Sequence, residues 1–229
     1  MGAKELAVMS MSVIIPTLNA ARCLRATLAA LGDVDDIVVA DGGSTDDTVA
    51  VAADFGARIV TATAGRGNQL IVGEHAAHHA WLLFLHADTV LETGWREEVE
   101  RFVSDPGNAQ RAATFHFALD DDSRKARRLE QLVALRVRKL GLPYGDQGLL
   151  IHRDFYRSLG GFRPWPLMED VDLMRRIGRD RLIMLGSVAR TSAERWRRDG
   201  WRWRSVKNLG CLTLYFLGIS PRFIARLYG

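Results

Sequence analysis

Several short segments of this sequence place carboxylates where they could bind a charged ligand. Asp41 follows an apolar run and precedes two glycines, and Asp88 ends the most hydrophobic run of the chain. A third group, Glu169, Asp170 and Asp172, opens a predicted helix. Carboxylates can ligate a hard divalent cation together with substrate phosphates, and an ionised carboxylate can accept a proton from an attacking hydroxyl. These residues are therefore candidates for metal-assisted chemistry on a phosphate-bearing ligand.

Each of these segments also has a purely structural interpretation. Ser44, with Asp47 three residues later, resembles a capping box at the start of a helix. Asp41 lies before that cap, at a strand end, where its carboxylate could accept the N–H of a nucleotide base. The acids of the later helix could instead offset the helix dipole. Asp146 and Gln147 could contact a donor or acceptor, or Asp146 could only form a turn.

Alternating apolar and helical patterns predict how these residues are positioned. The predicted strands are residues 12–16, 37–40, 58–61 and 81–85, and the predicted helices between them are 20–31, 45–55 and 68–80. This alternation indicates an α/β fold with a mostly parallel, Rossmann-like central sheet and helices on both faces. Ligands of such sheets bind beyond the carboxyl ends of the strands. That rule selects residues 17–19, 41–44, 61–67 and 86–89, which are rich in polar residues and glycine.

The second half of the chain has a mixed pattern. It predicts helices at 95–103, 124–140 and 170–177, a strand at 112–119, and a loop leading into a strand at 145–152. No repeat or linker is present, so we expect one domain of 229 residues. Its 48% hydrophobic and 25% charged residues exclude a disordered chain, and two distant cysteines, Cys23 and Cys211, exclude a disulfide scaffold.

The ends of the chain carry separate signals. Residues 1–9 show no basic segment followed by an apolar one, and Leu6 stands where a myristoylation site needs Ser or Thr, so we expect neither a secretory signal nor a lipid anchor. Residues 190–229 contain nine Lys or Arg and two acids, and residues 124–139 contain seven basic residues and one acid. The net charge of the chain is +4, but its basic residues are concentrated in these two segments. This predicts surfaces that meet an anionic partner.

Four segments, taken in order, resemble a known family. They are VIIPTLN (13–19), VADGGSTD (39–46), LHAD (85–88), and GGF (160–162) followed by MEDVDL (168–173). This series is similar to the ordered motifs of family 2 glycosyltransferases, especially a small bacterial subgroup of single-domain "transferase 2"-type proteins (rSAM/selenodomain-associated). The similarity extends from about residue 12 to residue 177, and features of residues 191–221 also resemble that subgroup.

The resemblance implies a GT-A fold and a metal-dependent, inverting transfer of a sugar from a nucleotide-sugar. It divides the domain into a nucleotide-sugar-binding half (about 12–110), an acceptor-binding half (about 111–189) and basic, apolar C-terminal helices (about 190–229). Asp88 would bind Mg or Mn, Asp170 would be the catalytic base with Glu169 as its rival, and Asp146 and Gln147 would contact donor or acceptor sugar. The positions implied to hold the nucleotide-sugar are Pro16, Thr17, Asn19, Asp41, Gly42, Arg66, His86, Ala87 and Asp88. A UDP-sugar is favoured, because Asp41 can accept the imino N–H of uracil, although guanine also offers a donor.

This sequence departs from the family pattern at several positions. His86 replaces the first aspartate of the Asp-x-Asp motif, Gly42 replaces an acid, Ala20 stands where many relatives have Glu, and Ile71 where Asn is frequent. With one acidic ligand left, a weaker metal site is expected. His86 could ligate the cation, contact a ribose, or only end the strand.

The C-terminal segment alternates Trp196, Trp201 and Trp203 with arginines, and a charge-free run of fourteen residues, 208–221, follows. That run is too short to span a bilayer, which needs about 20 residues. Two interpretations stay open. Residues 195–204 and 209–217 could lie on an anionic membrane surface, or the apolar run could close the core or form a homodimer face. Nucleic acid is not expected as a partner, although arginines and aromatic residues also occur in RNA-binding surfaces.

These observations predict a cytoplasmic protein, with attachment to the inner face of the plasma membrane as an option if the acceptor is lipid-linked. One alternative is a nucleotidyltransferase that makes nucleotide-sugars. Such an enzyme would need a glycine-rich loop after the first strand, where this chain has residues 17–21, Thr-Leu-Asn-Ala-Ala. Another alternative is a non-catalytic nucleotide-binding or membrane-scaffolding relative.

Overall fold

The computed structural model describes residues 10–228, and the expectations about residues 1–9 lie outside that range. Its strands are β1 (Met11–Thr17), β2 (Asp36–Asp41), β3 (Arg58–Thr61), β4 (Trp81–Phe84), β5 (Thr89–Leu91), β6 (Ala112–Leu119), β7 (Leu149–His152) and β8 (Leu182–Thr191). Its α-helices are α1 (Ala21–Leu31), α2 (Thr48–Asp54), α3 (Arg66–Ala76), α4 (Trp95–Val103), α5 (Arg124–Leu140), α6 (Arg153–Ser158), α7 (Glu169–Ile177), α8 (Glu194–Asp199), α9 (Trp201–Phe216) and α10 (Pro221–Tyr228). Short 3-10 helices are η1 (Pro106–Gln110), η2 (Gly145–Gln147) and η3 (Arg179–Arg181).

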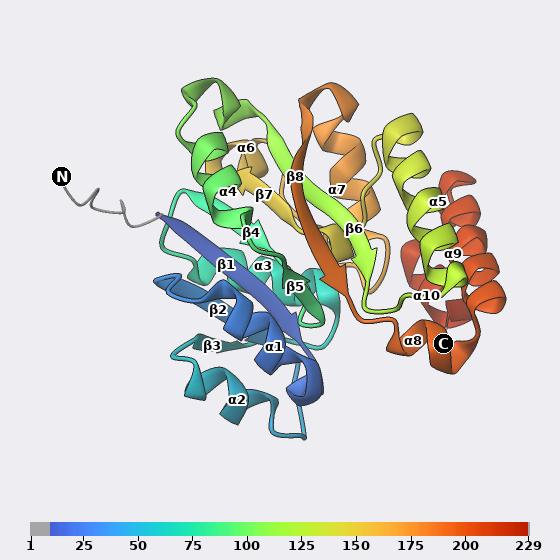
Figure 1. Ribbon diagram of the computed structural model, residues 1–229, viewed down its shortest axis with the longest axis horizontal. Helices are drawn as coiled ribbons and strands as arrows, with labels where there is room; N and C mark the ends of the chain where they lie inside the picture. Colours follow the sequence, from blue (N-terminus) through green and yellow to red (C-terminus); the bar gives the residue numbers. More distant parts are fainter. Residues whose placement is uncertain (1–9, 229) are drawn as a thin grey trace.

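The strands form one eight-stranded sheet in the order β3-β2-β1-β4-β7-β6-β8-β5. β1 pairs in parallel with β2 and β4, and β2 pairs in parallel with β3. β7 runs antiparallel to β4 and β6, while β6 and β8 are parallel. The sheet curls, because β5 follows β4 in the chain but pairs at the far end with β8 and also lies against α1 (Figure 1). The α/β architecture with a mostly parallel sheet, predicted from the sequence, is confirmed.

The alternation of side chains along β1 divides the core into two parts. Val13 and Ile15 belong to a cluster with the apolar sides of α1, α2 and α4, whereas Ile14 belongs to a second cluster with α3, α6, α7, α9 and α10. This division follows from the period of two in a strand, which sends successive side chains to opposite faces. Helices therefore cover both faces of the sheet, as expected for its parallel part.

Most predicted elements form within a few residues of their expected bounds, but three further elements and a different helix start are present. Strands β5 and β8 and helix α6 were not predicted. The capping box at Ser44 is wrong, because α2 begins at Thr48 and Ser44 Oγ lies 2.5 Å from Asp41 Oδ1. Asp46 Oδ1 instead accepts the Thr48 N–H at 3.0 Å. A short polar loop can satisfy a helix start in more than one way, so the residue types alone did not decide it.

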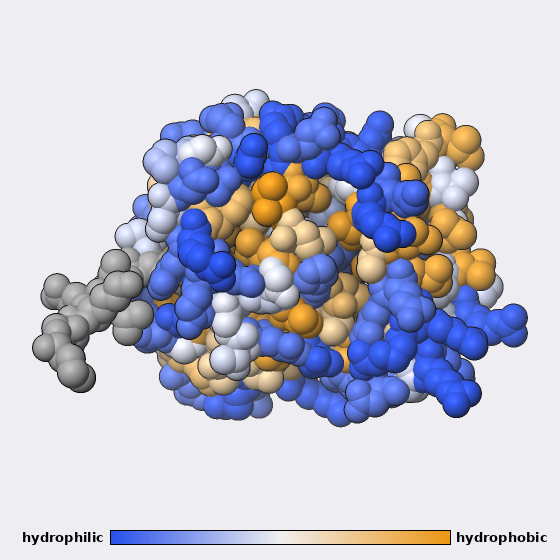
Figure 2. Space-filling view, turned by 45° about the horizontal axis from the view of Figure 1, so that its top comes forward, coloured by the Kyte–Doolittle hydropathy of each residue, from blue (hydrophilic) through white to orange (hydrophobic). Residues whose placement is uncertain are grey.

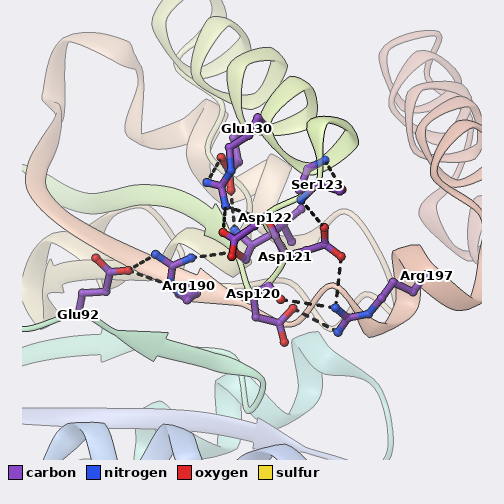
Figure 3. A network of polar contacts seen from close by, with 11 residues as sticks. Glu92, Asp120, Asp121, Asp122, Ser123, Glu130, Arg190 and Arg197 are labelled. Atoms are coloured by element: carbon purple, nitrogen blue, oxygen red, sulfur yellow. Dashed lines mark hydrogen bonds and ion pairs between the residues drawn. The ribbon is translucent and has the colours of Figure 1, made fainter.

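The C-terminal helices are tied to the sheet through charged side chains at the β6–α5 turn (Figure 3). Arg197 of α8 pairs with Asp120 and Asp121, which follow β6. Arg190 of β8 pairs with Glu92 and donates to the Leu119 carbonyl at 2.8 Å. These contacts hold α8 beside the end of the sheet, so the C-terminal segment is part of the folded domain.

Gly67 is placed where backbone elements meet closely. Its N–H donates to the Trp165 carbonyl at 3.2 Å, and a Cβ on Gly67 would lie 2.2 Å from the Arg163 carbonyl oxygen. The start of α3 therefore approaches the 163–165 loop at a distance that only glycine allows.

We predict that Gly67→Ala lowers the free energy of unfolding by about 2 to 3 kcal/mol, because backbone must move to admit the methyl group. Gly210→Ala is the matched control, since Gly210 is also helical and its added Cβ would meet nothing within 4 Å. The control should be neutral or more stable by up to about 1 kcal/mol. Urea unfolding checks both, and equal effects of the two substitutions would contradict the assigned contact.

Candidate active site

Five of the ionisable side chains that line one cavity of about 160 Å³ come from distant parts of the chain. They are Arg66 of α3, His86 and Asp88 after β4, Asp146 of η2 and Asp170 of α7. The β4 end carries two of them, in agreement with the rule that ligands bind beyond the carboxyl ends of strands. A cavity with several interacting charges is a candidate active site.

Glu169 and Asp170 are adjacent in sequence but occupy different environments. The Glu169 side chain is 1% exposed and pairs with Arg66 through a short contact between Oε1 and Nε. Asp170 lines the cavity, and its Oδ2 accepts the Gly145 N–H at 3.0 Å. Burial raises the pKa of Glu169, and the Arg66 guanidinium opposes that shift. Of the two carboxylates, Asp170 is the one placed to meet a ligand.

His86 is held against the backbone of η2. A Cβ on Gly145 would lie 2.4 Å from His86 Nε2, so a larger residue at position 145 would collide with the imidazole. Burial, together with the Arg66 charge, lowers the pKa of His86 to about 3. The imidazole is therefore neutral at physiological pH and can donate or accept one hydrogen bond to a ligand.

Asp146 is the most perturbed carboxyl of the cavity. Its pKa is raised to about 6. Burial is the largest cause, the charges of Asp170 and Asp88 act in the same direction, and Arg136 and Arg66 act against them. Its Oδ1 is buried and has no hydrogen-bond partner. An oxygen of this kind favours a ligand that brings positive charge or a hydrogen-bond donor.

The donor set fits a divalent cation that is shared with a ligand. Within residues 10–228 no three His, Cys, Asp or Glu side chains are grouped so that they could hold a metal ion by themselves. Mg²⁺ is commonly bound by one or two carboxylates while substrate phosphates and water complete its shell. Asp88 and the unpartnered oxygen of Asp146 supply such carboxylates in the same cavity. The residues present therefore suit a cation that binds together with a phosphorylated ligand.

Polar side chains at the ends of β1 and β2 form a second, neighbouring group. Asp41 Oδ1 accepts hydrogen bonds from Thr17 Oγ1 at 3.0 Å and from Ser44, and Oδ2 accepts the backbone N–H groups of Gly43 and Ser44. Burial opposes ionisation of Asp41, but these bonds outweigh it and lower its pKa. Asp41 does not line the cavity described above, and its acceptor positions are used by Thr17 and by the loop that follows it. A base contact would need one of these bonds to be exchanged.

Asn19 and Gln69 connect this group to the rest of the sheet edge. Asn19 has a positive φ of 50°, and its Oδ1 accepts the Thr45 N–H at 2.8 Å. Gln69 was not predicted as a site residue, yet its buried amide donates to the Thr17 and Ala40 carbonyls at 2.6 and 3.0 Å. A Cβ on Gly42 would lie 3.1 Å from that amide, so glycine lets the chain pass close to it.

The remaining predicted residues have other surroundings. Pro16 is half-buried within β1, and Ala87 is buried, with its carbonyl accepting from Thr27 Oγ1 at 2.8 Å. Gln147 does not line the cavity with Asp146. It lines a second cavity of about 470 Å³ between α5 and strands β6 and β8, and its buried Oε1 lacks a partner. Successive residues of η2 therefore face two different cavities.

The C-terminal helices supply residues that the sequence analysis did not assign to the site. Arg195 and Trp196 of α8, and Arg204 and Asn208 of α9, line the first cavity, as does Ser192 after β8. The Ser192 N–H donates to the Asp88 carbonyl at 3.1 Å, which fixes the end of β8 against the candidate metal ligand. The concentration of arginines was the sequence signal that could have placed these helices at the cavity, but such a concentration is equally typical of a solvent-exposed surface.

This chain is similar in sequence to known proteins. The sequence profile described as Glycosyl transferase family 2 matches residues 12–160, which is more than half of the chain. An uncharacterized glycosyltransferase of Rickettsia felis is 36% identical over 88 residues, which are 38% of this chain and 31% of that protein. The chain thus matches about a third of the length of this relative.

Solved structures show the same fold. Glucosyl-3-phosphoglycerate synthase from Mycobacterium tuberculosis, in complex with Mg²⁺ and UDP, is 21% identical with a TM-score of 0.58, covering 80% of this chain and 69% of that one. The same enzyme with Mn²⁺, UDP-glucose and phosphoglyceric acid is 23% identical with a TM-score of 0.55, covering 80% and 70%. At this identity the similarity establishes the fold.

We predict that Arg66→Met lowers the free energy of unfolding by about 3 to 5 kcal/mol near neutral pH, because it leaves the buried Glu169 carboxylate without its partner. Without Arg66, burial would raise the pKa of Glu169 further than in the native chain, so the variant should regain stability, relative to the native chain, as the pH falls and this carboxyl becomes protonated. Urea unfolding of Arg66→Met and of Arg66→Met/Glu169→Leu tests this. The double variant should recover at least half of the loss, and a double variant as unstable as the single one would argue against the pair.

Asp146 gives a prediction about pH. Because its pKa is raised in the folded state to about 6, the folded chain favours the protonated carboxyl. The stability that the protonated form contributes is lost as the pH rises through 6. Asp146→Asn should therefore become more stable relative to the native chain between pH 5 and pH 8, by about 1 to 2 kcal/mol. Asp180→Asn, at an exposed residue of η3, is the control and should show no such trend. A flat difference for Asp146→Asn would show that this carboxyl is ionised throughout the range.

Proposed function

We infer that this chain, which belongs to glycosyl transferase family 2, transfers a sugar from a nucleotide-sugar to an acceptor hydroxyl by a single displacement at the cavity of Asp88 and Asp170. One observation carries this proposal: Arg66, His86, Asp88, Asp146 and Asp170 come together at the carboxyl end of β4 although they are far apart in sequence. Family membership favours this activity over synthesis of the nucleotide-sugar. The proposal includes inversion of configuration at the anomeric carbon of the sugar, as expected from the sequence.

The size of the cavity supports a particular orientation of the donor. At about 160 Å³ it is smaller than the roughly 300 to 1,000 Å³ of sites that enclose a whole ligand. The sugar and diphosphate would occupy it, and the nucleoside would extend along the ends of β1 and β2, near Thr17, Asn19 and Asp41. UDP is the preferred carrier, and the synthase of the same fold that was solved with UDP supports that choice.

The cation would be Mg²⁺ or Mn²⁺, held by Asp88 with help from Asp146, and it would neutralise charge on the departing diphosphate. The same synthase was solved with each of these ions. Arg66 and Arg195 line the cavity and add positive charge beside the leaving group. Charge that develops on the leaving oxygen is thereby stabilised by groups already in place.

Asp170 is the residue proposed to accept the acceptor's proton. The acceptor oxygen forms a bond to the anomeric carbon while the bond from that carbon to the phosphate oxygen breaks, and the nucleoside diphosphate leaves with the electron pair. The hydroxyl proton passes to the Asp170 carboxylate, whose Oδ2 is oriented by the Gly145 N–H. Glu169 is unsuited to this step because it is buried and paired with Arg66.

We predict that UDP raises the melting temperature more than GDP, CDP or dTDP and that the effect requires Mn²⁺, since a ligand that binds only the folded chain stabilises it. Asp88→Asn should abolish the increase in melting temperature that UDP causes in the presence of Mn²⁺. Asp170→Asn should keep the UDP shift but lower the rate of UDP release from a UDP-sugar by about 10² to 10⁴-fold.

Asp154→Asn is the control for both readouts, because its side chain is 82% exposed and lies outside the cavity. The proposal fails if no nucleotide shifts the melting temperature with or without Mn²⁺. It also fails in its assignment of the base if Asp170→Asn turns over normally.

A further inference from the structure

Helices α9 and α10 and the turn between them expose several large apolar side chains. Six of these, which we call the C-terminal apolar face, are each more than half exposed: Trp203, Val206, Leu209, Leu217, Phe223 and Leu227. Figure 2 shows hydrophobic residues gathered on the side of the molecule where Figure 1 places α5, α9 and α10. Contiguous exposed apolar surface in a soluble protein marks an interaction site.

The arrangement along each helix shows that this exposure is organised. On α9, Arg204, Asn208 and Cys211 face inward and line the cavity, whereas Trp203 and Val206 lie on the opposite half of the helix. On α10, Phe223 and Leu227 are four residues apart and so share one side, with Arg222 and Arg226 forming a parallel row beside them. Ile224 is fully buried and anchors α10 to the core. Both helices are thus fixed on one side and apolar on the other.

The charge around this face selects its partner. Residues 200–229 contain no Asp or Glu, while Arg202, Arg222 and Arg226 are exposed. A symmetric contact between two copies would bring this basic surface against itself, which is unfavourable. An anionic bilayer offers both an apolar layer and negative headgroups, and Trp and Arg are the residues that lie at such an interface.

We propose that the C-terminal apolar face is a docking surface for an anionic membrane, with α9 and α10 lying in the interface rather than crossing it. Of the helices in residues 10–228, none has the length and apolar character needed to cross a bilayer. This surface shares Trp203, Leu209 and Leu217 with the one expected from the sequence, but three of the expected arginines are not part of it. Arg197 pairs with Asp120 and Asp121, and Arg198 and Arg204 pair with Asp199, so these arginines serve the fold.

The position of α9 has a consequence for substrate, which rests on the proposed function. The helix that would lie on the membrane also forms a wall of the candidate active site. The cavity would therefore lie about one helix diameter, roughly 10 to 12 Å, from the bilayer surface, and this short distance favours the lipid-linked acceptor expected from the sequence. Vesicle binding tests the surface and UDP release tests the enzyme, so either can fail independently.

The experiment is co-sedimentation of the full chain with vesicles of phosphatidylcholine alone or with about one third phosphatidylglycerol, at low and high salt. The native chain should bind the anionic vesicles, and salt should weaken binding because part of it is electrostatic. Arg222→Gln/Arg226→Gln should weaken binding about 25-fold, since each arginine contributes roughly fivefold at such a surface. Leu209→Ser/Phe223→Ser should weaken it by at least about tenfold.

Two matched controls complete the test. Arg101→Gln/Arg111→Gln makes the same change in net charge at exposed residues outside the C-terminal helices, and Val49→Ser removes an exposed apolar side chain on α2. Both should bind as the native chain does. The proposal is overturned if the native chain stays in the supernatant, if the controls lose binding equally, or if the Leu209/Phe223 variant still binds. It is also overturned if sedimentation without vesicles shows a dimer that this variant abolishes while vesicles bind neither protein. Circular dichroism of each variant verifies that it is folded.

Discussion

The buried ion pair between Arg66 and Glu169 joins the two halves of this chain at the candidate active site. Arg66 begins α3, which belongs to the parallel half of the sheet, and Glu169 begins α7, more than a hundred residues later. A carboxylate that is 1% exposed is costly to ionise unless a cation compensates it, so the pair fixes how α3 and α7 meet. The position of Asp170, one residue further on, follows from that junction.

A similar constraint acts at the ends of β1 and β2. Asp41 gathers four hydrogen bonds from Thr17, Gly43 and Ser44, and Gln69 joins the two strand ends through their carbonyls. These bonds satisfy polar groups that are removed from water where the sheet ends. The strand ends are thereby held in one geometry before any ligand arrives, which is the preorganisation that a binding edge requires.

The cavity concentrates charge that the fold only partly compensates. Asp88, Asp146 and Asp170 lie together, and their mutual repulsion contributes to the raised pKa of Asp146. Arg66 and Arg195 bring opposite charge, but the Asp146 Oδ1 atom is left without a partner. Such a site stores unfavourable energy in the free protein, and a bound cation with a diphosphate would relieve it.

The sequence by itself determined the alternation of strands and helices, the α/β class and the family, because period and strand-end motifs are local properties of the chain. It also singled out Asp88, Asp146 and Asp170 as candidates by their residue types, and the fold brings all three into one cavity. It did not separate Glu169 from Asp170, or Asp146 from Gln147, because adjacent residues of one helical turn face different neighbours only after packing. Strand β8 and the inward face of α9, with Arg204 and Asn208, were decided by tertiary structure alone. Their roles depend on which surfaces meet across the curled sheet, and no local pattern in the chain encodes that contact.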